Sequence, residues 1–390
     1  MKTEAILFTI DRFHIGGVTT FVKQYSQVLM ETTKYQVVII GLKGDIDNPE
    51  AFFPGAKVVV VNGFAKNGIF GKSLDFIKYY QTLNLVYKNF RINIIHMSTT
   101  WSSFYVLLHY KTHRVKKVIT FYGAYDLEVK SLFHRNSGLI DFFMIKIKLS
   151  LMRWMQSFTL SSSDRIITFS KFAAALIVDH FSQSLAKKIS VIPGYVEKSK
   201  IQIKIRKSKT PLLLSIGRIE PRKGIDLLIE SVAILIRQGF KLKLLIASPV
   251  EYWNLGGILT KYENLNMLFN IQFVHKLNEE QKKQFFAKAD LFIIPSREYE
   301  TFGMTILESM RHGVPVIGTK VGAIPEILSK FNTNFIIEDY SADLLADKIK
   351  WYLKQTEVQK SEHKLKCIEI TNKFYSKKKI SPLIMQAYFS

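Results

Sequence analysis

Residues 289–320 read ADLFIIPSREYETFGMTILESMRHGVPVIGTK and contain the pattern that decides the fold. The apolar run 291–294 is typical of a buried strand, and the amphipathic segment that starts near 301–303 is typical of a helix. Gly313 marks the end of that helix, and the apolar run 314–317 predicts the next strand. A strand, a covering helix and a second parallel strand form the unit from which doubly wound α/β sheets are built.

The same alternation of short apolar runs and helix-length segments recurs along the chain. Continuous apolar runs of this kind predict parallel strands that are buried on both faces. The fold class that we expect is α/β, with two Rossmann-like doubly wound domains facing each other across a cleft. The runs are EAILFTI, YQVVIIGL, KVVVVNG, INIIHMS, KKVITFYG and RIITFS in the first half, and TPLLLSIG, KLKLLIAS, QFVHKL, ADLFIIPS and VPVIGTK in the second.

The boundary between the two series lies in a basic, polar stretch. With 390 residues the chain is long enough for two domains of ordinary size. We expect an N-terminal domain over residues 1–198, a linker over 199–209 and a C-terminal domain over 210–374. Residues 375–390 predict a final helix. Ligands of such sheets bind beyond the carboxyl ends of the strands.

Composition narrows the environment and the partners. The chain has 55 Lys and Arg residues against 32 Asp and Glu, a formal net charge of +23. This excess attracts anionic surfaces or phosphorylated ligands, although a lysine-rich solvated surface explains it equally well. The single cysteine, Cys367, fits a buried spectator in a reducing compartment. No apolar stretch reaches the roughly 18 residues of a membrane span, and the start resembles no signal peptide, so we expect a soluble or peripheral cytoplasmic protein.

Two carboxylates, Glu300 and Glu308, lie eight residues apart around the predicted helix start, a little over two turns if both were helical. A helix start suits phosphate, and Gly303 lets a ligand approach the backbone closely. Carboxylates repel phosphate but accept hydrogen bonds from vicinal hydroxyls. The pair can therefore hold two polyols separated by a diphosphate, as in a sugar nucleotide. The alternative is that Glu300 is a helix-start charge and Glu308 a surface residue.

Two cations follow the first strand of the second series, in LLLSIGRIEPRKGID. The strand ends at Gly217, Arg218 and Lys223 lie in the loop, and a helix begins near Gly224. Cations at the mouth of such a unit can neutralise a diphosphate and stabilise it as a leaving group. Taken alone, the spacing fits an ordinary surface loop as well.

Together, SIGRIEPRKGID, the stretch from ADLFIIPS to GAIPEI, and the terminal FYSKKKISPLIMQAYFS resemble the retaining glycosyltransferases of family 4, which have the two-domain GT-B fold. The resemblance is strong over roughly 210–390 and fainter over 1–200. It implies a hexosyltransferase-type enzyme of polysaccharide biosynthesis that moves a sugar from a nucleotide-diphosphate sugar to an acceptor with retained configuration. The donor would bind the second domain, the acceptor would bind the first, and the last helix would pack back on the first domain.

The resemblance also implies roles for individual residues. The E-x7-E signature of the family is matched by Glu300, for the transferred sugar, and by Glu308, for the ribose. Arg218 and Lys223 would hold the diphosphate. The other implied contacts are the backbone of Phe302, Gly303, Met304 and Thr305 at the sugar-phosphate end, the glycine turn Gly16 and Gly17 near the diphosphate, and, loosely, His275 near the base.

The sequence departs from the family pattern in its first half. Tyr122, in TFYGAYD, stands where the family often has a histidine, and Ser98 replaces a second one. Tyrosine can donate a hydrogen bond to a sugar hydroxyl but does not carry a proton near neutral pH. Transfer in this fold relies on the leaving diphosphate as base, so activity need not be lost. Three alternatives stay open: another sugar-nucleotide enzyme of the same fold, such as an epimerase or an inverting transferase; a non-catalytic partner subunit that binds sugar nucleotides; and an anion-binding protein that uses its charge on nucleic acid, for which the sequence shows no recognition module.

Three other side chains near these loops allow two interpretations each. His96 could face the cleft, but a satisfied histidine at a strand end is the favoured interpretation. Asp126 and Glu128 could orient an acceptor, but we favour acidic residues in the first turn of a helix.

Residues 135–158, RNSGLIDFFMIKIKLSLMRWMQSF, predict a helix with a broad apolar face edged by Lys146, Lys148 and Arg153. Such a helix suits either a membrane interface or the cover of the sheet, and the second is favoured.

The partners that we expect are a nucleotide sugar, a glycan or lipid-linked acceptor and an anionic membrane surface at the inner face of the cell membrane. No motif for a metal, another cofactor or nucleic acid is present, so we expect none of them.

Overall fold

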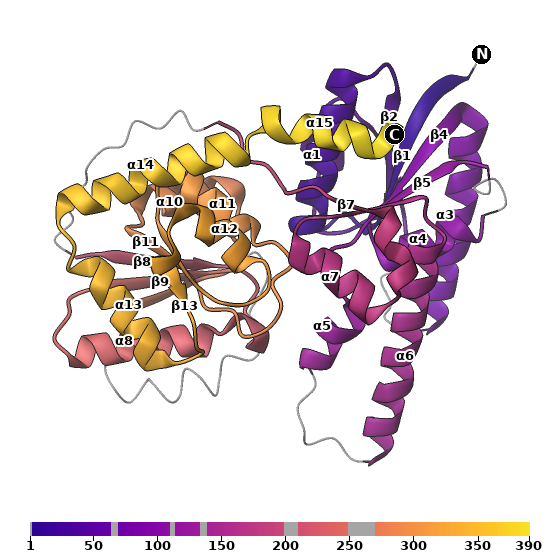
Figure 1. Cartoon of the computed structure of the whole chain (residues 1–390). Helices are drawn as coiled ribbons and strands as arrows, with labels where there is room; N and C mark the ends of the chain where they lie inside the picture. Colours follow the sequence, from indigo (N-terminus) through magenta and orange to yellow (C-terminus); the bar gives the residue numbers. More distant parts are fainter. Residues whose placement is uncertain (1, 64–68, 110–113, 133–138, 199–209, 249–269) are drawn as a thin grey trace. The chain divides into compact units, whose positions relative to one another are not determined.

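The computed structural model describes residues 2–63, 69–109, 114–132, 139–198, 210–248 and 270–390. The chain forms two compact α/β units (Figure 1). The first comprises Met1–Pro193 and Ile380–Ser390, and the second comprises Gly194–Lys379. The expected linker, 199–209, lies outside the described residues. The predicted fold class, two doubly wound parallel-sheet domains, is confirmed.

The first unit is built on one parallel sheet of seven strands. These are β1 (Thr3–Arg12), β2 (Gln36–Leu42), β3 (Lys57–Val61), β4 (Phe90–Met97), β5 (Lys116–Thr120), β6 (Arg165–Thr168) and β7 (Ile189–Val191). Their order across the sheet is β3-β2-β1-β4-β5-β6-β7. The middle of β1, from Ala5 to Phe8, is fully buried because helices cover both faces of the sheet.

Helices connect these strands and supply the covering layers (Figure 1). They are α1 (Gly17–Thr32), α2 (Pro49–Phe52), α3 (Ile69–Asn89), α4 (Thr100–Leu107), α5 (Tyr125–Leu132), α6 (Leu139–Ser161), α7 (Lys171–His180) and the 3-10 helix η2 (Gln183–Lys188). The helix predicted over 135–158 is therefore α6, which begins at Leu139 and ends at Ser161. Within the described ranges, no helix combines the length and the apolar character needed to cross a bilayer.

The second unit repeats the plan with a six-stranded sheet. Its strands are β8 (Leu212–Ile216), β9 (Lys243–Ala247), β10 (Ile271–Val274), β11 (Leu291–Ile294), β12 (Val316–Thr319) and β13 (Ile336–Ile337). Its helices are η3 (Pro221–Lys223), α8 (Ile225–Arg237), α10 (Glu279–Lys288), α11 (Met304–Arg311), α12 (Ile324–Phe331), η5 (Thr333–Phe335), α13 (Ala342–Leu353) and α14 (Glu357–Phe374). The strand order is β10-β9-β8-β11-β12-β13, and every pairing is parallel.

Strand order reverses once in each sheet, between β1 and β4 and between β8 and β11. The connections that leave these neighbouring strands run in opposite directions across the sheet. Doubly wound sheets bind their ligands at this switch point, beyond the carboxyl ends of the strands. The loops after β8 and β11 are therefore the first place to look for a site in the second unit.

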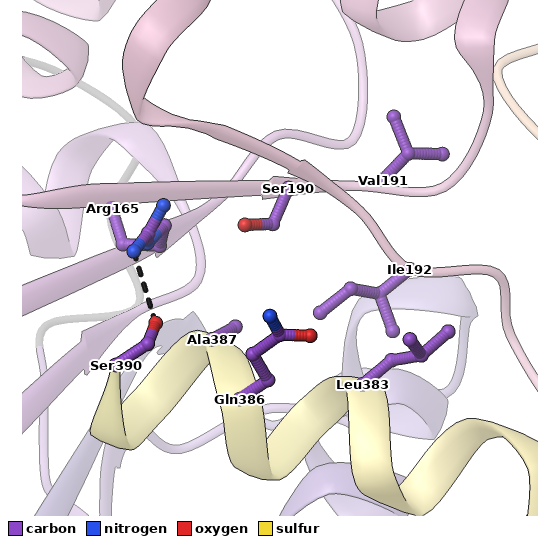
Figure 2. Close-up of a pocket in the computed structure, with 8 residues that line it drawn as sticks. All are labelled: Arg165, Ser190, Val191, Ile192, Leu383, Gln386, Ala387 and Ser390. Carbon is purple, nitrogen blue, oxygen red and sulfur yellow. Dashed lines mark hydrogen bonds between the residues drawn. The ribbon is translucent and has the colours of Figure 1, made fainter.

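The last helix, α15 (Lys377–Phe389), adds its residues from Ile380 onward to the first unit. It lies beside β7, and Ser390 accepts a hydrogen bond from Arg165 at 3.0 Å (Figure 2). A pocket of about 240 Å³ lies between β7 and this helix. Its lining runs from Arg165, the first residue of β6, to Ile192, directly after β7, so the pocket lies along the edge strand of the sheet and not at the switch point where such sheets bind ligands.

Candidate active site

The loops after β8 and β11 lie against each other at the switch point of the second sheet. The backbone N–H of Arg297 donates to the carbonyl of Arg222 at 2.8 Å. Close by, the Lys223 ammonium donates to the carboxylate of Glu300. Two residues that the sequence singled out separately, 77 positions apart, are thus brought into direct contact.

Two glycines make this close approach possible. A Cβ on Gly224 would lie 2.0 Å from the carbonyl oxygen of Pro295, and the φ of 65° there favours glycine. A Cβ on Gly322 would lie 2.5 Å from the backbone nitrogen of Glu300. The N–H of Ala323 also donates to the Glu300 carbonyl at 2.8 Å. Loops from three strands therefore hold Glu300 in place.

The electrostatic setting keeps Glu300 ionised. Its side chain is only 12% exposed, and this burial by itself raises the pKa of the carboxyl. The charges of Lys223, Arg222 and Arg218 oppose burial and outweigh it, so the pKa of Glu300 lies below its usual value. The site therefore holds a carboxylate together with a cluster of cations.

A second acid organises those cations. Glu220 bonds the Arg218 guanidinium at 3.0 Å and Arg222 Nε at 2.9 Å. Arg222 is almost fully buried, whereas about half of the Arg218 side chain is exposed. The sequence interpretation named Arg218 and missed Glu220 and Arg222. The closely spaced opposite charges of RIEPRK were the available signal.

The helix after Glu300 starts later than expected. α11 begins at Met304, with Gly303 as its N-terminal flanking residue, rather than between 301 and 303. Phe302 and Gly303 are buried, and Met304 and Thr305 are partly buried. The separation from Glu300 to Glu308 is therefore a loop plus about one turn, and the estimate of two helical turns was wrong.

Glu308 is a partly buried residue with a partner. Its carboxylate accepts a hydrogen bond from the Lys282 ammonium of α10 at 2.8 Å. Burial raises the pKa of Glu308, and the nearby Lys282 only partly opposes that effect. The alternative of an ordinary surface residue is therefore wrong. His275, the loosest of the implied contacts, is exposed directly after β10.

The predicted residues of the first unit gather beyond the carboxyl ends of its strands. The Tyr122 hydroxyl lies 3.5 Å from the carbonyl of Val18 in the first turn of α1. Gly16 and Gly17, at the start of the same helix, are exposed, and a Cβ on either would meet nothing within 4 Å among the described residues. Burial raises the pKa of Tyr122, so its phenol stays neutral.

Gln156 of α6 fixes the loop that carries Tyr122. Its amide nitrogen donates to the carbonyl of Gly123 at 2.8 Å, and its amide oxygen accepts from the N–H of Tyr125 at 3.0 Å. No sequence signal pointed to this residue, because the contact joins positions about 30 residues apart.

His96 is a core residue of the first unit. It is completely buried, with one ring nitrogen 2.8 Å from the Thr120 hydroxyl and the other bonded to the Tyr388 hydroxyl. Burial lowers the pKa of His96 to about 3, so the ring is neutral. The favoured interpretation of a satisfied histidine is confirmed.

Asp126 also has a partner within the first unit. Its carboxylate oxygens lie 2.9 and 3.0 Å from Nε2 of His180. Asp126 and Glu128 both belong to the first turn of α5, the interpretation favoured by the sequence. The described residues contain no group of three or more His, Cys, Asp or Glu side chains placed to hold a metal ion. The expectation that catalysis needs no metal stays a prediction.

Two doubly wound parallel domains of this kind define the GT-B class of fold, and solved structures of that class superpose on the whole chain. Sucrose-phosphate synthase from Thermosynechococcus elongatus matches with a TM-score of 0.80 at 16% identity, over 99% of this chain and 98% of that one. HepE from Anabaena, solved in complex with UDP and glucose, matches with a TM-score of 0.76 at 14% identity, over 98% of each chain.

The family follows from the sequence comparisons. Residues 15–200 match the model of Glycosyltransferase Family 4, and residues 196–373 match that of Glycosyl transferases group 1. The chain belongs to glycosyltransferase family 4.

Two curated relatives match part of the chain. An uncharacterized glycosyltransferase of Methanocaldococcus jannaschii is 27% identical over 212 residues, 54% of this chain and 55% of that protein. A D-inositol 3-phosphate glycosyltransferase of Streptomyces avermitilis is 26% identical over 196 residues, 46% of this chain and 42% of that protein. The matches thus span about half the length of these relatives.

Proposed function

We propose that this protein transfers a sugar from a nucleotide-diphosphate sugar to a glycan or lipid-linked acceptor, with retention of the anomeric configuration. The observation that carries the proposal is the contact between Lys223 and Glu300 at the switch point of the second sheet. A buried carboxylate beside clustered cations suits a ligand that presents both hydroxyls and phosphates.

On binding, the donor would separate Lys223 from Glu300, because its diphosphate would bind the lysine and its sugar hydroxyls would bind the glutamate. The diphosphate oxygens would bond Lys223 and the exposed guanidinium of Arg218. Glu300, freed from Lys223, would then accept hydrogen bonds from hydroxyls of the sugar. Because charge builds up on the diphosphate as its bond to the sugar breaks, these cations stabilise the transition state more than the ground state.

The start of α11 would complete the donor site. The backbone N–H groups around Phe302, Gly303, Met304 and Thr305 suit the sugar-phosphate end. Glu308 would accept hydrogen bonds from the ribose, and His275 would lie near the base.

The acceptor would bind the first unit. Tyr122 would donate a hydrogen bond to a hydroxyl of the donor sugar, and the open glycine turn at Gly16 and Gly17 would lie near the donor diphosphate. In the transfer, the acceptor oxygen bonds to the anomeric carbon as the bond from that carbon to the diphosphate breaks. The acceptor proton passes to a diphosphate oxygen, so the reaction requires no side chain as base. Arg218, Lys223 and the start of α11 would take the place of a metal ion at the diphosphate.

Relatives support the choice of donor. HepE is described in complex with UDP and with UDP-glucose. The actinobacterial relative acts on D-inositol 3-phosphate by its name. The HepE complexes support a nucleotide-diphosphate sugar as the donor, and the name of the relative supports a phosphorylated polyol as a second substrate.

A thermal-shift panel of nucleotide sugars tests the proposal directly. A donor that binds only the folded protein should raise the Tm by about 2 °C or more at saturating concentration. Lys223→Ala should abolish that shift, whereas Lys320→Ala, which breaks an exposed ion pair with Glu338, should leave it unchanged. A panel in which no nucleotide sugar shifts the wild-type Tm would contradict the proposal. The anomeric configuration of the product, read by NMR, then separates retention from inversion or epimerisation.

A further inference from the structure

The outer side of α6 carries a row of exposed apolar side chains. Successive members are three or four residues apart, so they share one face of the helix. Their exposed fractions run from 38% to 61%, unusually high for large apolar residues within one element. The row consists of Met144, Ile147, Leu151, Trp154 and Phe158.

The opposite side of α6 anchors the helix in the first unit. Met152, Met155 and Leu160 are buried there, and Gln156 holds the loop of Tyr122. The exposed row is therefore not the core-facing side of a covering helix. It is a second apolar face on a helix whose core-facing side is already packed.

The apolar row continues onto the neighbouring helix α4. The ring of Phe104 lies 6.2 Å from that of Trp154 and 6.0 Å from that of Phe158. Leu108, directly after α4, is about half exposed. We call the row on α6 together with Phe104 and Leu108 the α6 face. The amino-terminal half of α6 extends past the sheet of its own unit (Figure 1).

Cations border the α6 face. Lys146 and Lys148 are exposed on α6, and Arg153, also exposed, donates from its guanidinium to the carbonyl of His180 at the end of α7. Asp141 is the only acidic residue in the sequence 139–161. The helix thus combines an apolar row that includes tryptophan and phenylalanine with a cationic border. This combination is typical of helices that lie in the headgroup region of a bilayer.

We propose that the α6 face docks the protein on an anionic lipid bilayer, with the helix lying in the plane of the interface. Charge decides between this partner and a second copy of the chain. A two-fold contact places this face against a second copy of the same face, so the cations Lys146, Lys148 and Arg153 of each copy would meet a surface of like charge. An anionic bilayer complements them, with each cation near the surface adding to binding.

Docking through α6 would bring the unit that is proposed to bind the acceptor to the bilayer surface. Gln156 lies on the buried side of the docked helix and bonds both ends of the turn after Tyr122. If the first unit holds the acceptor, as proposed above, then an acceptor anchored in lipid arrives at the unit that contacts the bilayer.

Vesicle flotation with the full chain tests the docking without donor or acceptor. We expect the protein to float with vesicles of phosphatidylglycerol and phosphatidylcholine, and far less with phosphatidylcholine alone. The double variant Ile147→Asp with Leu151→Asp should lower partition into the anionic vesicles at least about tenfold. The control, Val358→Asp with Leu365→Asp, alters two apolar residues of α14 that are at least as exposed, and it should float like wild type.

Two further measurements keep the result interpretable. Trp154→Phe should abolish the blue shift in tryptophan fluorescence that anionic vesicles cause in the wild type. Circular dichroism melting of the α6 double variant should match the wild type, since both changed residues are exposed. The proposal is overturned if both double variants float equally. It is also overturned if the wild type sediments as a dimer in the absence of lipid and the α6 double variant, but not the control variant, disrupts this dimer while still floating with anionic vesicles. Neither result bears on nucleotide-sugar binding, which the thermal-shift panel measures separately.

Discussion

The two sheets reverse strand order in the same way, yet the side chains beyond their switch points differ in charge. Beyond β8 and β11 lie Arg218, Lys223 and Glu300, all charged and in part paired with one another. In the first unit, Ser98 and Tyr122 follow β4 and β5, and His96 is buried in the core near the end of β4; all three are neutral in the folded protein. Topology therefore determines where each site lies, and the residue types determine its chemistry.

Burial acts on both sites, and its outcome depends on the neighbours. It opposes ionisation of Glu300 and of His96 alike. Glu300 stays charged because cations stabilise its carboxylate, whereas His96 has only neutral hydroxyl partners and stays neutral. The comparison predicts that removing charge from the second unit affects turnover most, while changes in the first unit affect stability and specificity.

The largest expected effect comes from Lys223→Ala. Without the ammonium, Glu300 is a buried carboxylate that has lost its ion-pair partner, and the proposed donor would lose one of the two cations proposed to bind its diphosphate. We expect kcat/KM to fall about 1000-fold. Steady-state kinetics of sugar transfer measure this loss. Lys320→Ala, in an exposed ion pair of the same unit, is the matched control and should retain wild-type rates. Near-normal turnover of Lys223→Ala would remove the charged site from the mechanism.

Glu300→Gln should lower kcat about 100-fold, because an amide keeps the size of the side chain but attracts sugar hydroxyls and cations less strongly. In the double variant with Lys223→Ala, the losses should combine less than additively, since the two residues contact each other. Fully additive losses would show that the residues act independently.

His96→Gln tests the neutral site through pH. The folded pKa of His96, about 3, lies below the value of about 6.5 expected in the unfolded chain, so the unfolded state binds the proton first. The contribution of neutral His96 to the free energy of unfolding is fully present above about pH 6.5. It is lost as the pH falls toward 3, at up to about 1.4 kcal/mol per pH unit. Between pH 7 and pH 5 the wild type should lose about 2 kcal/mol more than the variant, measured by urea unfolding. Parallel pH profiles of the two proteins would show that His96 is not a buried neutral group.

Glu308→Gln should weaken nucleotide binding about tenfold with little change in kcat, because the proposed ribose contact would be remote from the bond that breaks. Isothermal calorimetry with the nucleotide measures this loss. Lys282→Gln removes the ion-pair partner and leaves the carboxylate, so it separates loss of the pair from loss of the ribose contact. Unchanged affinity in Glu308→Gln would refute the ribose role.

The smallest effect is expected from Tyr122→Phe. One hydrogen bond from a neutral phenol contributes about 1 kcal/mol, so kcat/KM should fall about fivefold. Selectivity among donor sugars, compared in competition assays, should change more than the rate with the preferred donor. A loss as large as that of Glu300→Gln would place Tyr122 in the chemistry itself.

Much of the fold could be predicted because its signals are local. Short apolar runs such as 291–294 predicted buried parallel strands, and the structure contains β11 there. The helix start near Gly303 was less well predicted, because a glycine in the left-handed region ends a loop but does not by itself determine where helical hydrogen bonding begins. The roles of the site residues rest on the family motif and stay predictions.

The pairings within the site could not be predicted. Glu220 and Arg222 were missed, and the contact of Glu308 with Lys282 joins two helices whose packing no local pattern encodes. The solvent exposure of the apolar row on α6 could not be predicted either, because helical periodicity shows that a face is apolar but not whether another element covers it.

The sequence by itself determined the two parallel α/β domains, the excess of positive charge and the positions of the two glutamates and two cations, because residue spacing and composition are properties of the chain. The tertiary structure alone decided that Lys223 meets Glu300, that His96 is buried and neutral, and that one side of α6 is left uncovered. Ion pairing and burial depend on which distant segments become neighbours, and that is settled only when the strands assemble into a sheet and the loops at its edge meet.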